Sequence, residues 1–209
     1  MKELFKINII IVFIFFGTEM YSRSIDFSIL REGDIIFHES ISEQATAIKL
    51  ATNSRYTHVG IIFKERNIMF VLEAIQPVKK TKLENFIKRG KNNHFVVKRL
   101  KDSVKIIDSN SISRMKEYGY KFIGKDYDYT FEWNDNRIYC TELVWKIYKN
   151  VLGVDVGELK TLESFDLSSD KVKKIMNKRY GKNIPLNEIV ISPEDIFIAD
   201  NLYTIISNN

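Results

Sequence analysis

The feature that most constrains the fold is a pair of apolar segments close together in the chain. Residues 56–63 read Tyr-Thr-His-Val-Gly-Ile-Ile-Phe and residues 68–75 read Ile-Met-Phe-Val-Leu-Glu-Ala-Ile. Short runs rich in β-branched and aromatic residues are typical of buried strands. Four polar residues, 64–67, separate them and suit a hairpin loop. The sequence therefore predicts a central antiparallel sheet that contains this strand pair.

A histidine and a carboxylate face each other in the expected hairpin. If residues 64–67 form the loop, Phe63 lies opposite Ile68 and His58 lies opposite Glu73, with Cβ atoms about 4.5–5.5 Å apart. A carboxylate in an apolar strand costs free energy unless it is paired, and orienting an imidazole would explain it. The alternative is a structural pair on an exposed sheet face, and a one-residue slip would separate the two side chains.

Cys140 is the only cysteine of the 209 residues, and it begins an amphipathic segment, 140–148. Apolar residues follow it at helical spacing, namely Leu143, Val144, Ile147 and Val151. A lone thiol is either a buried filler or a nucleophile. Free N–H groups and the positive dipole end at a helix start favour the thiolate, which is the nucleophilic form. The helical phase points Cys140 toward the sheet, where Gly60 leaves room beside His58.

The chain order of these groups is His58, Glu73, Cys140. Papain-like hydrolases use cysteine, histidine and a polar orienting residue, in that order. The same roles in rotated order indicate a circular permutation.

The sequence closely resembles the YiiX family, a permuted branch of the NlpC/P60 cysteine hydrolases. The resemblance covers most of the chain from about Leu30 onward and is carried by residues 33–37 (Gly-Asp-Ile-Ile-Phe), 54–62 (Ser-Arg-Tyr-Thr-His-Val-Gly-Ile-Ile), 73–78, 94–100, 127–148, 156–159 and 191–193. It implies an α+β, circularly permuted papain-like NlpC/P60 fold, with a central antiparallel sheet and the nucleophile helix packed on it. It also implies Cys140 as nucleophile, His58 as base and Glu73 as the third member.

The resemblance implies a cysteine hydrolase or amidase that cleaves amide bonds in cell-wall peptides such as peptidoglycan. Two alternatives remain. One is a thiol acyl hydrolase or acyltransferase on lipids, because members of the wider permuted group act on acyl lipids; the other is a non-catalytic envelope-binding module. A groove for a charged peptide would favour the amidase, and a deep apolar tunnel would favour the lipid enzyme. No cofactor is expected, and metal ligation is unsupported because Asp126-Tyr127-Asp128 alone is a weak signal.

The N-terminal segment resembles a signal peptide. Lys2 and Lys6 precede a short apolar run, residues 7–16, and polar residues follow it. We therefore expect residues 1–24 to direct export to the periplasm, and residues 25–209 to form the hydrolase domain. An uncleaved segment would instead anchor the protein to a membrane. The net charge of +5, from 32 basic and 27 acidic residues, suits an anionic envelope or ordinary solubility, and no basic and aromatic cluster indicates nucleic acid.

The remaining segments give a coarse outline. Strands are expected at 33–37 and 94–100, and helices at 42–51, 82–90 and 108–122, with Gly90 as a C-cap. We expect His94 at the surface, because it follows Asn92 and Asn93. The aromatic loop 124–136 either walls a substrate groove or packs in the core, and the polar segment 153–184 is expected to form helices and loops.

Overall fold

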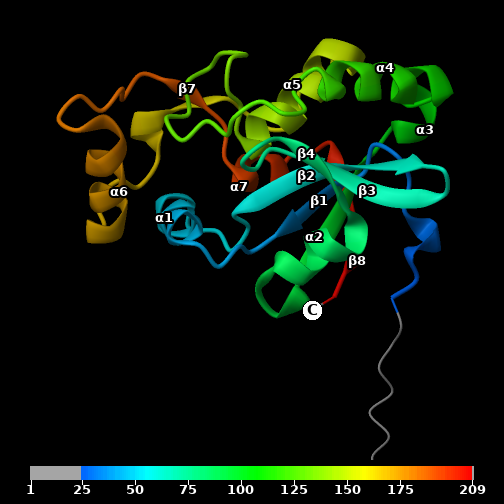
Figure 1. The fold of residues 1–209 in the computed structure, drawn as a ribbon, viewed down its shortest axis with the longest axis horizontal. Coiled ribbons are helices and arrows are strands. Elements are labelled where there is room, and N and C mark those ends of the chain that lie inside the picture. Colours follow the sequence, from blue (N-terminus) through cyan, green and yellow to red (C-terminus); the bar gives the residue numbers. More distant parts are fainter. Residues whose placement is uncertain (1–24, 209) are drawn as a thin grey trace, which may run out of the picture.

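The computed structural model describes residues 25–208, which fold around one six-stranded sheet (Figure 1). All neighbouring strands are antiparallel, and their order is β4-β3-β2-β1-β5-β8. The strands are β1 (Ile35–His38), β2 (His58–Glu65), β3 (Ile68–Glu73), β4 (Lys79–Lys82), β5 (Phe95–Leu100) and β8 (Leu202–Ser207). The expected central antiparallel sheet is confirmed, although the sequence reasoning missed the two edge strands, β4 and β8.

Side chains cap the starts of several helices. They are α1 (Glu43–Thr52), α2 (Leu83–Arg89), α3 (Ser103–Ile106), α4 (Ser109–Tyr120), α5 (Cys140–Leu152), α6 (Asp170–Tyr180) and α7 (Pro193–Phe197). Four of them begin after a residue whose side chain accepts a backbone N–H bond: Ser42, Asp108, Ser169 and Ser192. The helices expected at 42–51, 82–90 and 108–122 are thus confirmed within a few residues.

Helices cover both faces of the sheet. On one face, Val59, Ile61 and Phe63 belong to the same buried cluster as Leu143 and Val144 of α5. On the other face, Ile36, Ile62 and Val71 of the strands belong to the same buried cluster as Leu83 and Phe86 of α2. The architecture is therefore α+β, with the Cys140 helix packed on the sheet as expected.

The β2–β3 hairpin differs from the expected one by two residues. Phe63 pairs with Phe70 and Glu65 pairs with Ile68, so the loop is only Arg66 and Asn67. Both loop residues have positive φ, which is 46° at Arg66 and 65° at Asn67. Positive φ at both positions is typical of the two-residue turns whose twist matches that of the strands. The four-residue loop was wrong because Lys64 and Glu65, although polar, continue the strand beyond the buried core.

A third apolar cluster lies beside the sheet, where α1 and α6 pack together (Figure 1). It joins both helices to a two-stranded ribbon of β6 (Lys160–Thr161) and β7 (Ile189–Val190). Its buried members are Ala47, Leu162, Val172, Met176 and Val190. The segment expected to be polar helices and loops therefore contributes α6 and a small core of its own.

The segment expected to be a signal peptide, residues 1–24, lies outside the described residues. Within residues 25–208, no helix combines the length and the apolar character needed to cross a membrane.

Candidate active site

His58 and Glu73 meet despite the shifted register. His58 Nε2 lies 2.6 Å from Glu73 Oε2, and both residues are buried. The shift is an even number of residues, so both side chains stay on the same face of the sheet. Extending the observed register places Gly60, rather than His58, opposite Glu73. The two side chains are therefore diagonal neighbours across the strand pair.

Gly60 makes this diagonal contact feasible. A Cβ atom at this position would lie 2.4 Å from Val71 Cγ1 and 2.8 Å from the Leu72 carbonyl oxygen. It would also lie 3.3 Å from Glu73 Cβ. The sequence predicted that another element approaches the chain closely at Gly60, beside His58, and that element is the neighbouring strand β3.

Arg89 is a partner of Glu73 that the sequence reasoning missed. Its Nη2 atom lies 2.6 Å from each carboxylate oxygen of Glu73. Arg89 occupies the last turn of α2, where a basic residue is also favoured by the helix dipole. That local preference gives no hint of a partner on β3, so no sequence signal linked the two residues.

The carboxylate of Glu73 is held in its ionised form. Burial is the largest influence on its pKa and acts to raise it, because the charged form loses water. Hydrogen bonds and charge interactions with His58 and Arg89 outweigh burial and lower the pKa of Glu73 to about 2.

Cys140 is the first residue of α5, as expected, and its side chain is buried in the cluster that joins α5 to the sheet. The first helical bond runs from the Leu143 N–H to the Tyr139 carbonyl, at 3.0 Å. The earlier N–H groups of a helix have no intrahelical acceptor. They are therefore available to a negative charge that forms at the sulfur.

His58 links Cys140 to Glu73. Burial is the largest influence on the pKa of His58 and lowers it, but hydrogen bonding to Cys140 and Glu73 raises it to about 9. Because Nε2 contacts Glu73, Nδ1 is the ring nitrogen left for the thiol. The structure thus brings together all three residues that the sequence singled out.

The contact between His58 and Cys140 forms at the end of the sheet rather than across one face. His58 is the first residue of β2, and its alternation places it on the α2 side with Ile62. Cys140 is the first residue of α5, which packs on the opposite side. The two side chains therefore meet where both elements begin.

Two neutral rings hold the imidazole of His58. Phe86 stacks on it, with ring centroids 5.6 Å apart, and His38 lies edge-on at 5.1 Å. His38 pairs directly with His58 in the β1–β2 register. Burial, followed by the nearby His58, lowers the pKa of His38 to about 3, so His38 is neutral at ordinary pH.

The expected surface position of His94 was wrong. His94 is buried and stacks on Tyr56, with ring centroids 6.2 Å apart. The polar residues Asn92 and Asn93 before it suggested exposure, but the chain turns inward at His94 to enter β5. Gly90 does end α2, yet its φ of −68° is not the left-handed cap conformation.

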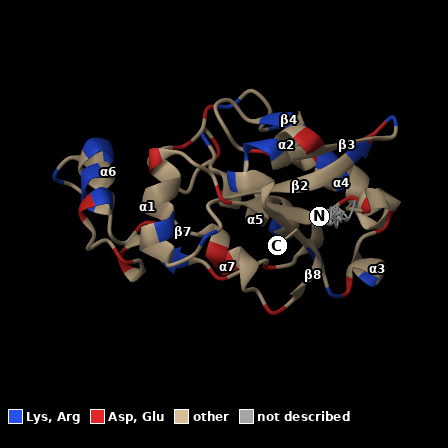
Figure 2. Cartoon of the chain, turned by 90° about the horizontal axis from the view of Figure 1, so that it is seen from below, with Lys and Arg blue, Asp and Glu red and all other residues tan. Residues whose placement is uncertain are grey.

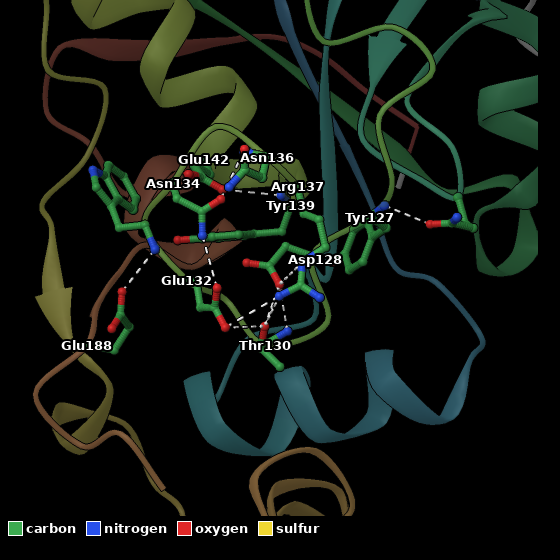
Figure 3. A network of polar contacts seen from close by, with 12 residues as sticks. Tyr127, Asp128, Thr130, Glu132, Asn134, Asn136, Arg137, Tyr139, Glu142 and Glu188 are labelled. Atoms are coloured by element: carbon green, nitrogen blue, oxygen red, sulfur yellow. Dashed lines mark hydrogen bonds and ion pairs between the residues drawn. The ribbon is translucent and has the colours of Figure 1, made fainter.

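A polar network holds the loop before Cys140 (Figure 3). Arg137 lies 3.0 Å from Thr130 Oγ1 and forms ion pairs with Asp128 and Glu132. Elsewhere in the loop, the Trp133 N–H donates to Glu188, and the Tyr127 N–H donates to Gln76 Oε1. These bonds fix the aromatic loop against several elements at once.

Tyr127, from this loop, lies beside Cys140. Gln44 Nε2 donates to the Tyr127 hydroxyl oxygen at 2.9 Å. Burial, followed by the nearby Cys140, raises the pKa of Tyr127, and a hydrogen bond with Cys140 adds to the effect. Because Gln44 fills an acceptor position, the single hydroxyl proton of Tyr127 is free to point toward Cys140.

A mostly apolar pocket opens beside Cys140, with about 90 Å³ of unfilled space. Its walls come from α1, α6, the segment after β6, and the residues around β7. The aromatic loop contributes Tyr127 and Phe131 to these walls, so part of it does wall a pocket. The other side chains at the pocket include Ala47, Ile48, Leu162, Phe165, Val172, Ile175, Met176, Arg179 and Val190.

Comparison with known proteins defines the class. The family model described as permuted papain-like amidase enzyme, YaeF/YiiX, C92 family matches residues 29–206. The chain therefore belongs to this family of papain-like amidases, which are cysteine hydrolases. The expected family and the permuted papain-like fold are confirmed.

Individual relatives can be named as well. The chain is 42% identical over 173 residues to the uncharacterized protein YiiX of Escherichia coli K12, spanning 83% of this chain and 84% of that protein. The fold is similar to the crystal structure of metalloprotein yiiX from Escherichia coli O157:H7, with a TM-score of 0.81 and 41% identity. That similarity covers 85% of this chain and 97% of the other.

Proposed function

We propose that this protein is a cysteine amidase in which Cys140 is the nucleophile, His58 the general base and acid, and Glu73 the residue that orients His58. The observation that carries this proposal is the buried His58, which contacts Glu73 at 2.6 Å and interacts with the Cys140 thiol. A nucleophile, a base and a group orienting the base are the three parts that acyl transfer needs.

The proposed reaction has two stages. His58 takes the thiol proton, and the Cys140 thiolate attacks the amide carbonyl carbon. His58 then gives that proton to the nitrogen, the C–N bond breaks, and the amine leaves behind a thioester on Cys140. In the second stage His58 takes a proton from water, which attacks the thioester and releases the acid and the thiol. Glu73 remains ionised and stabilises the imidazolium throughout.

The tetrahedral intermediates carry a negative oxygen that needs hydrogen-bond donors. We assign the backbone N–H of Cys140 and the hydroxyl of Tyr127 to this task. The Tyr127 hydroxyl already accepts from Gln44 at 2.9 Å, which leaves its proton to donate. Donors fixed before the reaction cost little reorganisation when the charge forms.

An amide bond of a cell-wall peptide is the first candidate substrate, through the resemblance to the NlpC/P60 hydrolases. An acyl lipid is the second candidate, because the pocket beside Cys140 is mostly apolar. The pocket's size favours the first: about 90 Å³ is less than the roughly 150 Å³ of a cavity that holds benzene. A short apolar group fits this space better than a long acyl chain.

Digestion of purified peptidoglycan and of phospholipid vesicles by the wild type and Cys140→Ala tests the proposal. We expect peptidoglycan fragments whose masses show one hydrolysed amide, with none from Cys140→Ala. Free fatty acid from the vesicles instead would identify the lipid enzyme. Products from neither substrate, together with retained binding, would indicate an envelope-binding module.

The E. coli O157:H7 relative is described as a metalloprotein. In the described part of this chain, no three His, Cys, Asp or Glu side chains are grouped so that they could hold a metal ion. The residues present here therefore do not fit a resident metal, and the proposed steps use protein groups and water.

We also propose that residues 1–24 direct export, which would place the hydrolase domain in the periplasm. The support is the basic start and the short apolar run at residues 7–16. N-terminal sequencing of protein from the native envelope tests it. We expect a mature N-terminus near Ser24, whereas intact Met1 in the membrane fraction would indicate an uncleaved anchor.

A further inference from the structure

An arginine at the pocket beside Cys140 has no ionic partner within the described residues. Arg179 lies in the last turn of α6 and lines the pocket. Its guanidinium lies over the ring of Phe131, 4.8 Å from the ring centroid. Within residues 25–208, the neighbouring titratable groups interact with the Arg179 guanidinium through longer-range electrostatics and not through a hydrogen bond. Basic residues are frequent on α6 (Figure 2), and its four lysines are exposed, whereas Arg179 is half-buried.

Asp128 is the acidic group that acts on Arg179, at longer range and without a hydrogen bond. Its Oδ1 accepts from the Thr130 N–H at 2.8 Å and pairs with Arg137, whereas its buried Oδ2 has no hydrogen-bond partner among the described residues and forms no ion pair with Arg179. The other titratable groups that act on Arg179 are phenols, namely Tyr127, Tyr129 and Tyr180, and none of them is a carboxylate. Partial burial of an unpaired cation among apolar groups costs free energy. A ligand anion would offset that cost.

We propose that the substrate carries a carboxylate on a short apolar acyl group, with the apolar part in the pocket beside Cys140 and the carboxylate on Arg179. This inference rests on the proposed amidase function. An arginine fork binds a carboxylate through two parallel hydrogen bonds, which gives geometric selectivity as well as affinity. The acyl group stays in the pocket as the Cys140 thioester, and water releases it as a dicarboxylic acid.

Matched amide substrates test the preference. Mono-4-nitroanilides of succinic to suberic acid each carry a terminal carboxylate, and the neutral 4-nitroanilides of equal chain length do not. In the wild type we expect the best carboxylate substrate to exceed its neutral match in kcat/KM by about tenfold, the size of one charge-assisted hydrogen bond. Arg179→Gln should abolish this preference, and Arg179→Lys should keep part of it. Lys178→Gln, an exposed neighbour outside the pocket, should leave the preference unchanged.

A second measurement separates this inference from the amidase proposal. Alkylation of Cys140 by 6-bromohexanoate and by 6-bromohexanamide needs no hydrolysis. We expect Arg179→Gln to lower the ratio of the bromohexanoate rate to the bromohexanamide rate about tenfold. Lys178→Gln should leave this ratio unchanged. If the ratio changes but wild type hydrolyses no amide, the anion site stands and the amidase proposal fails. If amides are cleaved and neither preference depends on Arg179, the anion site is wrong.

Discussion

Glu73 shares its carboxylate between two cationic partners. Arg89 lies 2.6 Å from both oxygens, and His58 lies 2.6 Å from one of them. A buried carboxylate is stable only when such partners replace its lost water. The low pKa of Glu73, about 2, means that it stays anionic over the range in which His58 titrates. In the proposed mechanism, Glu73 therefore acts through charge and orientation rather than by exchanging a proton.

Substitution of Glu73 should separate orientation from charge. Glu73→Gln keeps the length and an acceptor for His58, so we expect it to retain more activity than Glu73→Ala. Both should fall below the wild type and remain well above Cys140→Ala, because the thiol forms the bond and the carboxylate tunes the base. Steady-state kcat and KM of the three purified variants provide the check. Wild-type turnover by folded Glu73→Ala would show that another residue orients His58.

At the scale of elements, the β2–β3 hairpin shows what the sequence can and cannot predict. The apolar alternation fixes which face each residue takes, so His58 and Glu73 were expected on one face and are found there. Alternation does not fix where the strands turn. Asn67 is a residue type that often adopts positive φ, but arginine is not, so the identity of Arg66 gives no indication of a turn at this position. The two-residue turn was therefore not predicted.

The hairpin turn offers a test at this scale. The double variant Arg66→Asn and Asn67→Gly places residues that favour positive φ at both turn positions. We expect it to raise the free energy of unfolding by about 0.5–1 kcal/mol, because the backbone strain of Arg66 is relieved. Urea denaturation measures this change. Arg66→Ala, which tolerates positive φ no better, should give no gain, and equal gains from both variants would contradict this explanation.

Helix α5 was predictable for a different reason. The 3.6-residue spacing of Leu143, Val144 and Ile147 after Cys140 defined both its buried face and the direction of the thiol. Partners that come from distant elements were not predictable. Arg89 reaches Glu73 from α2, and His38 reaches His58 from β1, through packing that no local pattern records.

At the scale of the whole molecule, the site joins both sides of the sheet. His58 is packed by Phe86 of α2 on one side, whereas Cys140 belongs to α5 on the other. The pocket adds α1 and α6 from a third cluster. Charge interactions in the site therefore form only when these layers are assembled, and they contribute to the stability of the fold.

The stability of the fold should depend on pH through His58. Its folded pKa, about 9, is above its ordinary value of 6.5. The stabilisation that it provides is therefore fully present below pH 6.5 and is lost as the pH rises through about 9. We expect the difference in free energy of unfolding between wild type and His58→Gln to be larger at pH of about 6 than at pH of about 10. Denaturant titrations at both values check this, and a constant difference would contradict the raised pKa.

The central claim is that Cys140 forms an acyl-enzyme. The most direct measurement is the intact mass of the protein after it is mixed with an acyl 4-nitroanilide and quenched in acid. We predict a wild-type species heavier by one acyl group, mapped to the peptide that contains Cys140, and no such species from Cys140→Ala. Turnover of the same substrate by Cys140→Ala at the wild-type rate, or an acyl group on another residue, would contradict the account.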